Sequence, residues 1–393
     1  MTTDETMALY STHVIGNYDA VRVPVVLVKG EGSYVWDQEG RRYLDLFPGW
    51  GVNGLGHCHP AVVEAVQKQT GKLMHVANDY YNEHQGRLAG MIAERSFGGK
   101  CFFCNSGAEA VEAAIKLARI YCSPRYKIIT MTNSFHGRTS MAMVATAQPK
   151  YQFGLPPVDL GFVYVPFDDL DAVAAAIDAD TCAVMVEPIQ GEGGVNIPGA
   201  DYHARLRALC DRHNMLLIYD EVTTGSGRTG KYYAYQHFGA EPDIMTLAKA
   251  MGGGLAVGAI EARPDVAAKL TPGTHASTFG GNPLACVGAI AMLEAIERDN
   301  LLEHGTKMGE KLMEGLRGLA GAFDVIADVR GKGCLIGMEL KVPGAEFRTL
   351  CRNEGLLINC THGNVIRFYP SLCASPEEID EAVSIVKTVL PGI

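Results

Sequence analysis

The stretch Ile244-Met245-Thr246-Leu247-Ala248-Lys249, followed at once by Ala250-Met251-Gly252-Gly253-Gly254, does most to decide the fold of this chain. Its apolar residues predict a short buried strand that ends at a lysine. Because burial disfavours the charged form, such a lysine has an amine that readily attacks a carbonyl carbon. In the ordinary alternative, the aliphatic stem of Lys249 packs while its ammonium group reaches water. The segments on either side distinguish the two interpretations.

Apolar strands alternate with helical stretches from about residue 60 onward. This alternation predicts an α/β fold whose mostly parallel sheet is covered by helices on both faces. Strands are expected at Lys100–Cys104, Lys127–Met131, Cys182–Glu187, Met215–Glu221, Ile244–Leu247 and Val257–Glu261. Helices are expected at Gly107–Tyr121, Leu170–Ile177 and Tyr202–His213.

The two ends of the chain follow a different pattern. Residues 25–45 predict a hairpin with strands near Val25–Val28 and Tyr34–Trp36. Asn282 and Pro283 open a long helix toward Asp299, as N-cap and first helical residue. Short strands and a closing helix follow it, at Val325–Val329, Gly333–Glu339, Gly355–Ile358, Val365–Phe368 and Pro376–Val389. We expect an N-terminal segment over residues 1–45, a large domain over 46–285 and a small α+β domain over 286–393.

Composition excludes several classes of protein. The 393 residues are 47% hydrophobic and 20% charged, as is usual for a soluble globular enzyme of two domains. A formal net charge of −10 without a long basic run argues against a nucleic-acid partner. Met1–Thr6 lacks the basic and apolar parts of a signal peptide, and no run of about 18 apolar residues could span a membrane. We therefore expect a cytoplasmic protein.

The cysteines do not indicate a disulfide framework or a metal site. Eleven of them are scattered along the chain, which is typical of small buried side chains in a reducing compartment. Cys101 and Cys104 should lie on opposite faces of their strand. His57-Cys58-His59 has no second pair of ligands nearby. We expect no bound metal.

Four segments that follow predicted strands carry chemistry. Ser106-Gly107-Ala108-Glu109 opens a helix, and its spacing fits a capping box or a phosphate site at the positive end of the helix. Asp220 lies near the end of a strand, where it could cap a helix, join an ion pair or hold a protonated ring nitrogen. Ser134–Thr139 and Glu187–Gly194 also follow strands, and taken singly their residues could be core or surface.

Two other enzyme classes have weaker support. Gly225-Ser226-Gly227-Arg228-Thr229-Gly230 matches the dinucleotide-binding G-x-G-x-x-G pattern. However, its glycines begin five residues after Asp220 rather than directly after a strand, and Lys231–Tyr235 is not typical of the apolar helix that should follow. A serine hydrolase is not supported either, because the chain has no G-x-S-x-G motif.

Eight segments in order resemble the class III aminotransferases, which are pyridoxal 5'-phosphate enzymes of fold type I. They are Gly51–Pro60, Asn105–Ala110, Phe135–Thr139, Glu187–Gly194, Asp220–Val222, Leu247–Lys249, His275–Pro283 and Val365–Phe368. The resemblance spans most of the chain and implies a large cofactor-binding domain followed by a smaller C-terminal α+β domain.

The resemblance also implies a role for each matching residue. Lys249 would carry the cofactor covalently, and Asp220 would pair with its ring nitrogen. The remaining cofactor contacts would come from Val222 and Phe135 on the two ring faces, from Ser106, Gly107 and Ala108 at the phosphate, and from Thr278 of the neighbouring subunit of a homodimer. Arg138 and Arg367 would hold substrate carboxylates, with Glu192 shielding Arg367 while the amine donor is bound.

Two positions depart from the family pattern. Thr223 stands where the family usually has a glutamine that bonds the phenolic oxygen of the cofactor, and threonine has a shorter reach. The segment Gly16–Pro24 does not match the usual substrate-contacting tyrosine, so Tyr18 receives no role.

The reaction implied by the resemblance is transfer of the δ-amino group of N2-acetylornithine to 2-oxoglutarate, a step of arginine biosynthesis. Ornithine, 4-aminobutyrate and succinyl-diaminopimelate are the alternative amine donors. From other classes, we keep a nicotinamide-dependent oxidoreductase and a catalytically silent dimeric scaffold as alternatives. A yellow protein that loses its colour in Lys249→Ala would argue against both.

Overall fold

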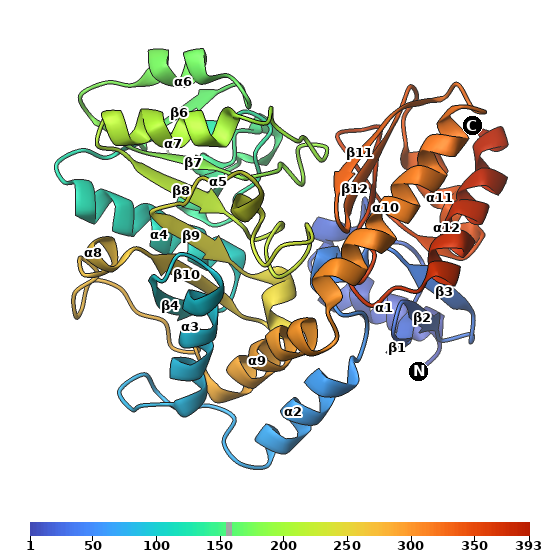
Figure 1. The fold of residues 1–393 in the computed structure, drawn as a ribbon. Coiled ribbons are helices and arrows are strands. Elements are labelled where there is room, and N and C mark those ends of the chain that lie inside the picture. The colour runs from blue at the N-terminus through green and yellow to red at the C-terminus, as the bar shows by residue number, and fades with distance from the viewer. Residues whose placement is uncertain (155–158) are drawn as a thin grey trace.

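A seven-stranded sheet forms the centre of the larger body of the molecule (Figure 1). The structure is a computed structural model, and it describes residues 1–154 and 159–393. The strand order of the sheet is β4-β10-β9-β8-β7-β5-β6. Strands β5 to β9 run parallel, and β10 lies antiparallel between β4 and β9. The strands are β4 (Lys100–Cys104), β5 (Lys127–Met131), β6 (Phe162–Val165), β7 (Thr181–Val186), β8 (Leu216–Asp220), β9 (Ile244–Leu247) and β10 (Gly258–Ala262). The predicted α/β class is confirmed.

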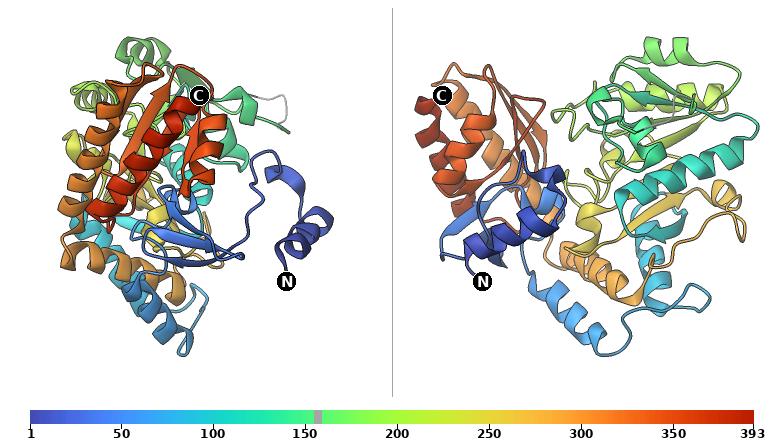
Figure 2. Two further views of the ribbon diagram at one scale, coloured as in Figure 1. Left: turned by 90° about the vertical axis from the view of Figure 1, so that its right-hand side faces the viewer. Right: turned by 180° about the vertical axis from the view of Figure 1, so that it is seen from behind.

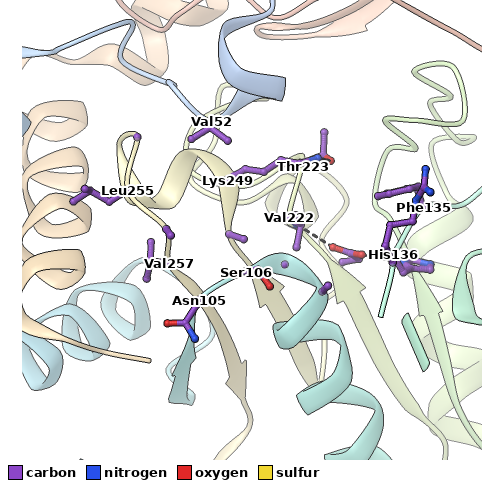
Figure 3. A pocket seen from close by; sticks show the side chains of 18 residues that line it. Val52, Asn105, Ser106, Phe135, His136, Val222, Thr223, Lys249, Leu255 and Val257 are labelled. Atoms are coloured by element: carbon purple, nitrogen blue, oxygen red, sulfur yellow. Dashed lines mark hydrogen bonds and ion pairs between the residues drawn. The ribbon is translucent and has the colours of Figure 1, made fainter. Parts of the chain in front are cut away.

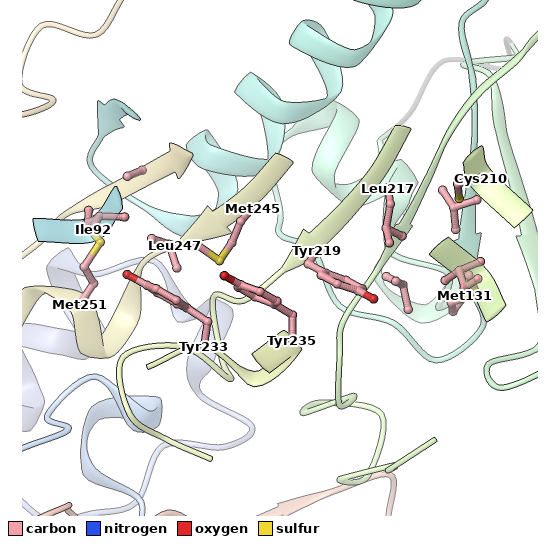
Figure 4. Close-up of a cluster of buried hydrophobic side chains, with 14 of the residues drawn as sticks. Ile92, Met131, Cys210, Leu217, Tyr219, Tyr233, Tyr235, Met245, Leu247 and Met251 are labelled. Carbon is pink, nitrogen blue, oxygen red and sulfur yellow. The ribbon is translucent and has the colours of Figure 1, made fainter. Parts of the chain in front are cut away.

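Alternate residues of these strands build two cores, because neighbouring side chains of a strand point to opposite faces. Leu217 and Tyr219 pack on one face with helices α3, α7 and α9, while Leu216 and Ile218 pack on the other with α4, α5 and α8. The helices are α2 (Pro60–Thr70), α3 (Glu83–Arg95), α4 (Gly107–Cys122), α5 (Ser140–Ala145), α6 (Leu170–Ala176), α7 (Tyr202–Arg212), α8 (Pro264–Ala267) and α9 (Pro283–Arg298). Figure 4 shows the first face, where the rings of Tyr219, Tyr235 and Tyr233 follow one another with nearly parallel planes.

The smaller body has two sheets that share one core (Figure 1). The first has the order β1-β2-β3-β13 and the second β11-β12-β15-β14. Their strands are β1 (Leu27–Glu31), β2 (Tyr34–Asp37), β3 (Arg42–Asp45), β11 (Ile326–Lys332), β12 (Leu335–Leu340), β13 (Leu356–Leu357), β14 (Asn359–Thr361) and β15 (Val365–Phe368). Helices α10 (Leu301–Ala320), α11 (Ala345–Asn353) and α12 (Pro376–Val389) pack with them. Since Leu44 belongs to this core and Tyr34 packs against it, we propose that the 1–45 segment packs with a small domain over 286–393, beside a large domain over 46–285.

Several elements differ from expectation, among them β6, α2 and α3, which were not predicted. The predicted strand Gly355–Ile358 is reduced to β13 and pairs parallel with β3, because Leu44 and Leu46 donate backbone N–H groups to Gly355 and Leu357. Helix α10 was not predicted, although its apolar residues recur at helical spacing. Helix α1 (Thr3–His13) has no buried residue and projects from the body at the N-terminus (Figure 2).

The described residues contain neither a candidate membrane span nor a candidate metal site. Among the helices of residues 1–154 and 159–393, none is long and apolar enough to cross a membrane. In the same residues, no group of three or more His, Cys, Asp or Glu side chains could hold a metal ion.

The Gly225–Gly230 run is a buried turn that leads to the short helix η4 (Ala234–His237), not to a long helix. Its Arg228 is only 1% exposed and ties three distant segments together. The guanidinium donates to the carbonyl oxygens of Pro370 over 2.6 Å, Gly51 over 3.3 Å and Cys334 over 3.4 Å. The G-x-G-x-x-G match therefore has a structural explanation.

Replacing Arg228 with alanine should destabilise the protein by about 2–4 kcal/mol, because three carbonyl oxygens would lose a charged donor inside the fold. The measurement is the midpoint of thermal unfolding. Arg205→Ala, at an exposed arginine whose ion pair with Asp201 spans 3.4 Å, is the matched control and should change stability by no more than about 0.5 kcal/mol. Equal unfolding midpoints for the two variants would contradict a stabilising role of the hydrogen bonds from Arg228 to the three carbonyl oxygens.

Candidate active site

A cavity of about 510 Å³ opens where strands β5, β8 and β9 end and helix α4 begins (Figure 3). Loops beyond the carboxyl ends of parallel strands are the usual ligand site of such sheets. The lining comes from Val52 and from five further segments, namely 105–108, 135–138, Asp220 with Val222 and Thr223, 248–249 and 254–257. Most of the segments singled out in the sequence are thus brought together.

Lys249 lies directly after β9 and turns into this cavity. Its φ of 45° is left-handed, a conformation that stores about 1–2 kcal/mol in a residue with a side chain. The Nζ donates to Thr223 Oγ1 over 2.6 Å and has no carboxylate partner among the described residues. Burial lowers the pKa of Lys249, although the charge of Glu192 acts in the opposite direction. The amine is therefore held ready to lose its proton.

Asp220 is buried at the end of β8 and accepts three hydrogen bonds. Its Oδ1 accepts from the backbone N–H of Val222 over 3.0 Å and from the Thr246 hydroxyl over 2.9 Å. Its Oδ2 lies 2.6 Å from Nδ1 of His136. A carboxylate has about four lone-pair sites, so Asp220 can accept one further donor from the cavity.

Sequence reasoning missed His136, which lines the cavity, and the buried Glu187, whose carboxylate accepts from the backbone N–H of Phe135 beside it. Burial acts to lower the pKa of His136, but the hydrogen bond and charge of Asp220 outweigh it and raise the pKa. Burial raises the pKa of Glu187 to about 7, against the backbone N–H groups of Gly191 and Phe135 that donate to it. Both residues stand in the segments that follow β5 and β7, which was the available signal. Their contact with the Asp220 region depends on strand order.

The start of helix α4 presents backbone N–H groups at the cavity. Ser106 caps the helix by accepting from the Glu109 N–H over 3.2 Å. The expected capping box is only half formed, because the Glu109 carboxylate accepts from Asn105 rather than from Ser106. The N–H groups of Gly107 and Ala108 have no acceptor among the described residues. They are the donors that a phosphate at a helix N-terminus takes up.

Gly107 also fixes the width of the site. A Cβ at this position would lie 2.8 Å from Cγ1 and 3.1 Å from Cγ2 of Val222, closer than real contacts allow. The start of α4 and the Val222 side chain can therefore lie this close only because residue 107 is glycine. Phe135 lines the same cavity from the β5 side (Figure 3).

Arg367 is buried and already hydrogen-bonded, whereas Arg138 is exposed. Arg367 is 1% exposed and is held by Glu192 Oε1 over 2.7 Å and by Asn359 Oδ1 over 2.6 and 2.9 Å. Burial acts to raise the pKa of Glu192, but the charge of Arg367 outweighs it and lowers the pKa. Arg138 is exposed at the cavity, and within the described part of the chain it forms no ion pair or hydrogen bond.

Four residues considered in the sequence are not among those that line the cavity. Two of them, Arg367 and Glu192, form the ion pair described above. Thr278 is exposed in the loop before α9 and is not among the residues that line the cavity of its own chain. Tyr18 is 58% exposed on the N-terminal segment and does not line the cavity either.

The chain is similar to known proteins along nearly its whole length. The family model "Aminotransferase class-III" matches residues 15–390. A curated acetylornithine aminotransferase of Caldanaerobacter subterraneus is 52% identical over 378 residues, which cover 95% of this chain and 96% of the relative. Further curated relatives with the same name are 44–47% identical.

Solved structures of aminotransferases are also similar to this chain along its whole length. An ornithine aminotransferase of Toxoplasma gondii, described with partial occupancy of PLP at its active site, has a TM-score of 0.94 and 34% identity. It covers 100% of this chain, which covers 95% of it. An acetylornithine aminotransferase of Elizabethkingia anophelis has a TM-score of 0.88, 34% identity and full coverage of both chains (100% each).

The raised pKa of Glu187 predicts a stability that falls as the pH rises. Below pH 4.5 the carboxyl is protonated in both states, but between 4.5 and about 7 the unfolded chain releases the proton and the folded protein keeps it. Relative to Glu187→Gln, which does not titrate, wild type should lose up to about 1.4 kcal/mol per pH unit in this window and nothing further above it. Thermal unfolding from pH 4.5 to 8 measures the difference.

Glu64→Gln, at an exposed carboxylate of α2, is the control and should track wild type throughout. A constant difference between wild type and Glu187→Gln over the whole range would contradict the prediction.

Proposed function

The chain belongs to the class III aminotransferases, and from that premise we propose that it transfers the δ-amino group of N2-acetylornithine to 2-oxoglutarate. The products are N-acetylglutamate 5-semialdehyde and glutamate, in arginine biosynthesis. The observation that carries the proposal is the Lys249 amine, which has no carboxylate partner among the described residues and opens into the same cavity as the buried Asp220 carboxylate. The choice of donor is supported by the name that the full-length relatives share.

The family depends on pyridoxal 5'-phosphate, and the cavity suits this group. The free N–H groups of Gly107 and Ala108, with the Ser106 hydroxyl, suit its phosphate. The remaining acceptor site of Asp220 suits a protonated ring nitrogen. We propose that Val222 and Phe135 pack on the two faces of the ring and that Lys249 carries the group covalently.

When bound, the cofactor supplies an aldehyde that joins amines and a ring that accepts an electron pair from the carbon losing its proton. Asp220 keeps the ring nitrogen protonated, and His136 holds the Asp220 carboxylate in place from the other side. The Nζ of Lys249 would take the proton from the substrate carbon that bears the amine and later return it as an acid. Thr223, which stands in the position of the usual glutamine, would accept from the Lys249 amine and hold it in place while that amine is free.

We propose that the two arginines let one site accept two substrates. N2-acetylornithine has one carboxylate, and we propose that the open guanidinium of Arg138 binds it while Glu192 neutralises Arg367. 2-Oxoglutarate has two carboxylates, and the second must displace Glu192 to reach Arg367. Arginine binds carboxylates through two parallel hydrogen bonds, so both contacts also orient the substrate.

We further propose a homodimer in which Thr278 reaches the phosphate of the partner subunit. Its exposure on its own chain fits a contact that is made across an interface. Nearby, the Asn78 side chain donates to the carbonyls of Ser277 and Gly280 over 3.1 Å, and this joins the loop before α3 to the loop before α9. The joined loops expose large apolar side chains, at Leu73, Met74, Tyr80, Tyr81 and Phe279, as surfaces between subunits do.

The eleven free cysteines support a cytoplasmic location.

A panel of amine donors with 2-oxoglutarate tests the proposed reaction. N2-acetylornithine should give a kcat/KM at least about tenfold above ornithine, 4-aminobutyrate and succinyl-diaminopimelate, a difference of about 1.4 kcal/mol in transition-state binding. The measurement is glutamate formed per unit time by the holoenzyme, with Lys249→Ala as the inactive control. Faster reaction with any of the other three donors would overturn the choice of donor but not the family.

A further inference from the structure

The guanidinium of Arg138 is held by the face of an aromatic ring. Its Cζ lies 4.0 Å from the centroid of the Tyr151 ring and 5.6 Å from that of Phe135. A cation this close to a ring face is attracted by the ring electrons without use of any hydrogen-bond donor. In residues 1–154 and 159–393 nothing accepts from Arg138, so all five of its N–H groups stay available.

Arg367, by contrast, is held in place by hydrogen bonds to neighbouring side chains. Its Nε and both terminal nitrogens already donate, to Asn359, Glu192 and Tyr369. A carboxylate must break some of these bonds before it can bind there. Holding Arg138 by a ring face therefore fixes an arginine in place while leaving it open to a ligand.

Tyr151 is itself well positioned for this contact. It ends the short helix η3 (Pro149–Tyr151), and its backbone N–H donates to the Gln148 carbonyl over 2.9 Å. The Gln148 side chain donates in turn to the carbonyls of Asn133 and Ser134, over 3.1 and 2.8 Å. The turn that carries Tyr151 is thus pinned to the segment that carries Arg138.

The Tyr151 ring also packs against the Phe135 ring. The two rings lie 5.7 Å apart between centroids at an angle of 88°, the edge-to-face geometry that aromatic pairs favour. Phe135 in turn donates its N–H to the buried Glu187 over 3.0 Å. Tyr151 therefore links the residue that we place on the cofactor ring to the residue that we place on the substrate carboxylate.

We propose that Tyr151 is a positioning residue, which holds Arg138 by its ring face so that the guanidinium binds the carboxylate of the amine donor. The inference rests on the role proposed above for Arg138. It deepens the proposed function by making Tyr151 a determinant of affinity for donors that carry a carboxylate.

The test compares two donors that differ only in that carboxylate, N2-acetylornithine and N-acetylputrescine. The holoenzyme is mixed with each donor, and the loss of its visible absorbance gives an apparent Kd and a saturating rate. Tyr151→Ala should raise the apparent Kd for N2-acetylornithine roughly 3- to 30-fold and leave its saturating rate unchanged. The apparent Kd for N-acetylputrescine should not change.

Three controls separate this role from a general structural one. Tyr151→Phe keeps the ring and should restore wild-type affinity to within about twofold. Tyr10→Ala removes a tyrosine that stacks on Arg22 at 4.8 Å, away from the cavity, and should have no effect. In an Arg138→Ala background, Tyr151→Ala should add no further loss, because the ring acts through the guanidinium.

Equal losses for both donors, a loss in Tyr151→Phe as large as in Tyr151→Ala, or additive losses with Arg138→Ala would each overturn the inference. Failure of the proposed function gives a different result, in which wild type itself does not react with N2-acetylornithine. The same comparison is then made with the donor that does react and its decarboxylated form, such as ornithine and putrescine.

Discussion

The parallel pairing of β8 with β9 is the constraint on which the candidate site depends. Asp220 lies opposite Thr246 in this pairing, and the Thr246 hydroxyl donates to its carboxylate over 2.9 Å. Because both strands run in the same direction, the chain leaves β9 for Lys249 at the edge where β8 ends at Asp220. A slip of one residue would turn either side chain to the opposite face of the sheet. The backbone register therefore sets the relation of carboxylate and amine before any ligand binds.

Around these two residues, each charge has its own partner in a different direction. Asp220 binds His136, and Glu192 binds Arg367, so neither carboxylate forms an ion pair with Lys249. The hydrogen-bond partner of Lys249 is the uncharged hydroxyl of Thr223. Burial therefore lowers the pKa of the Lys249 amine. Arg138 completes the pattern, because a ring face holds it and leaves its donors free. In the proposed reaction, a carboxylate ligand would meet one open arginine, Arg138, and one that Glu192 must first release, Arg367.

Much of the fold and of the site could be predicted from sequence, since periodicity and motifs are local properties. Strands β4, β5, β9 and β15 begin and end where expected. Strand direction and partner are not local, so the antiparallel β10 and the pairing of β13 with β3 were missed. His136 and Glu187 lie in segments that the sequence analysis singled out. Their roles could not be predicted, because the environment of both side chains is formed by three neighbouring strands. The stack of Tyr151 on Arg138 depends on a turn thirteen residues further along the chain.

We propose that Lys249, among all lysines of the chain, carries the cofactor. The most direct measurement is to load the purified protein with pyridoxal 5'-phosphate, reduce it with borohydride and locate the pyridoxyl group by mass spectrometry of its peptides. We predict one modified site, Lys249, and none in the same peptide digest of Lys249→Ala. A pyridoxyl group on a different lysine, at equal occupancy in wild type and Lys249→Ala, would contradict the account.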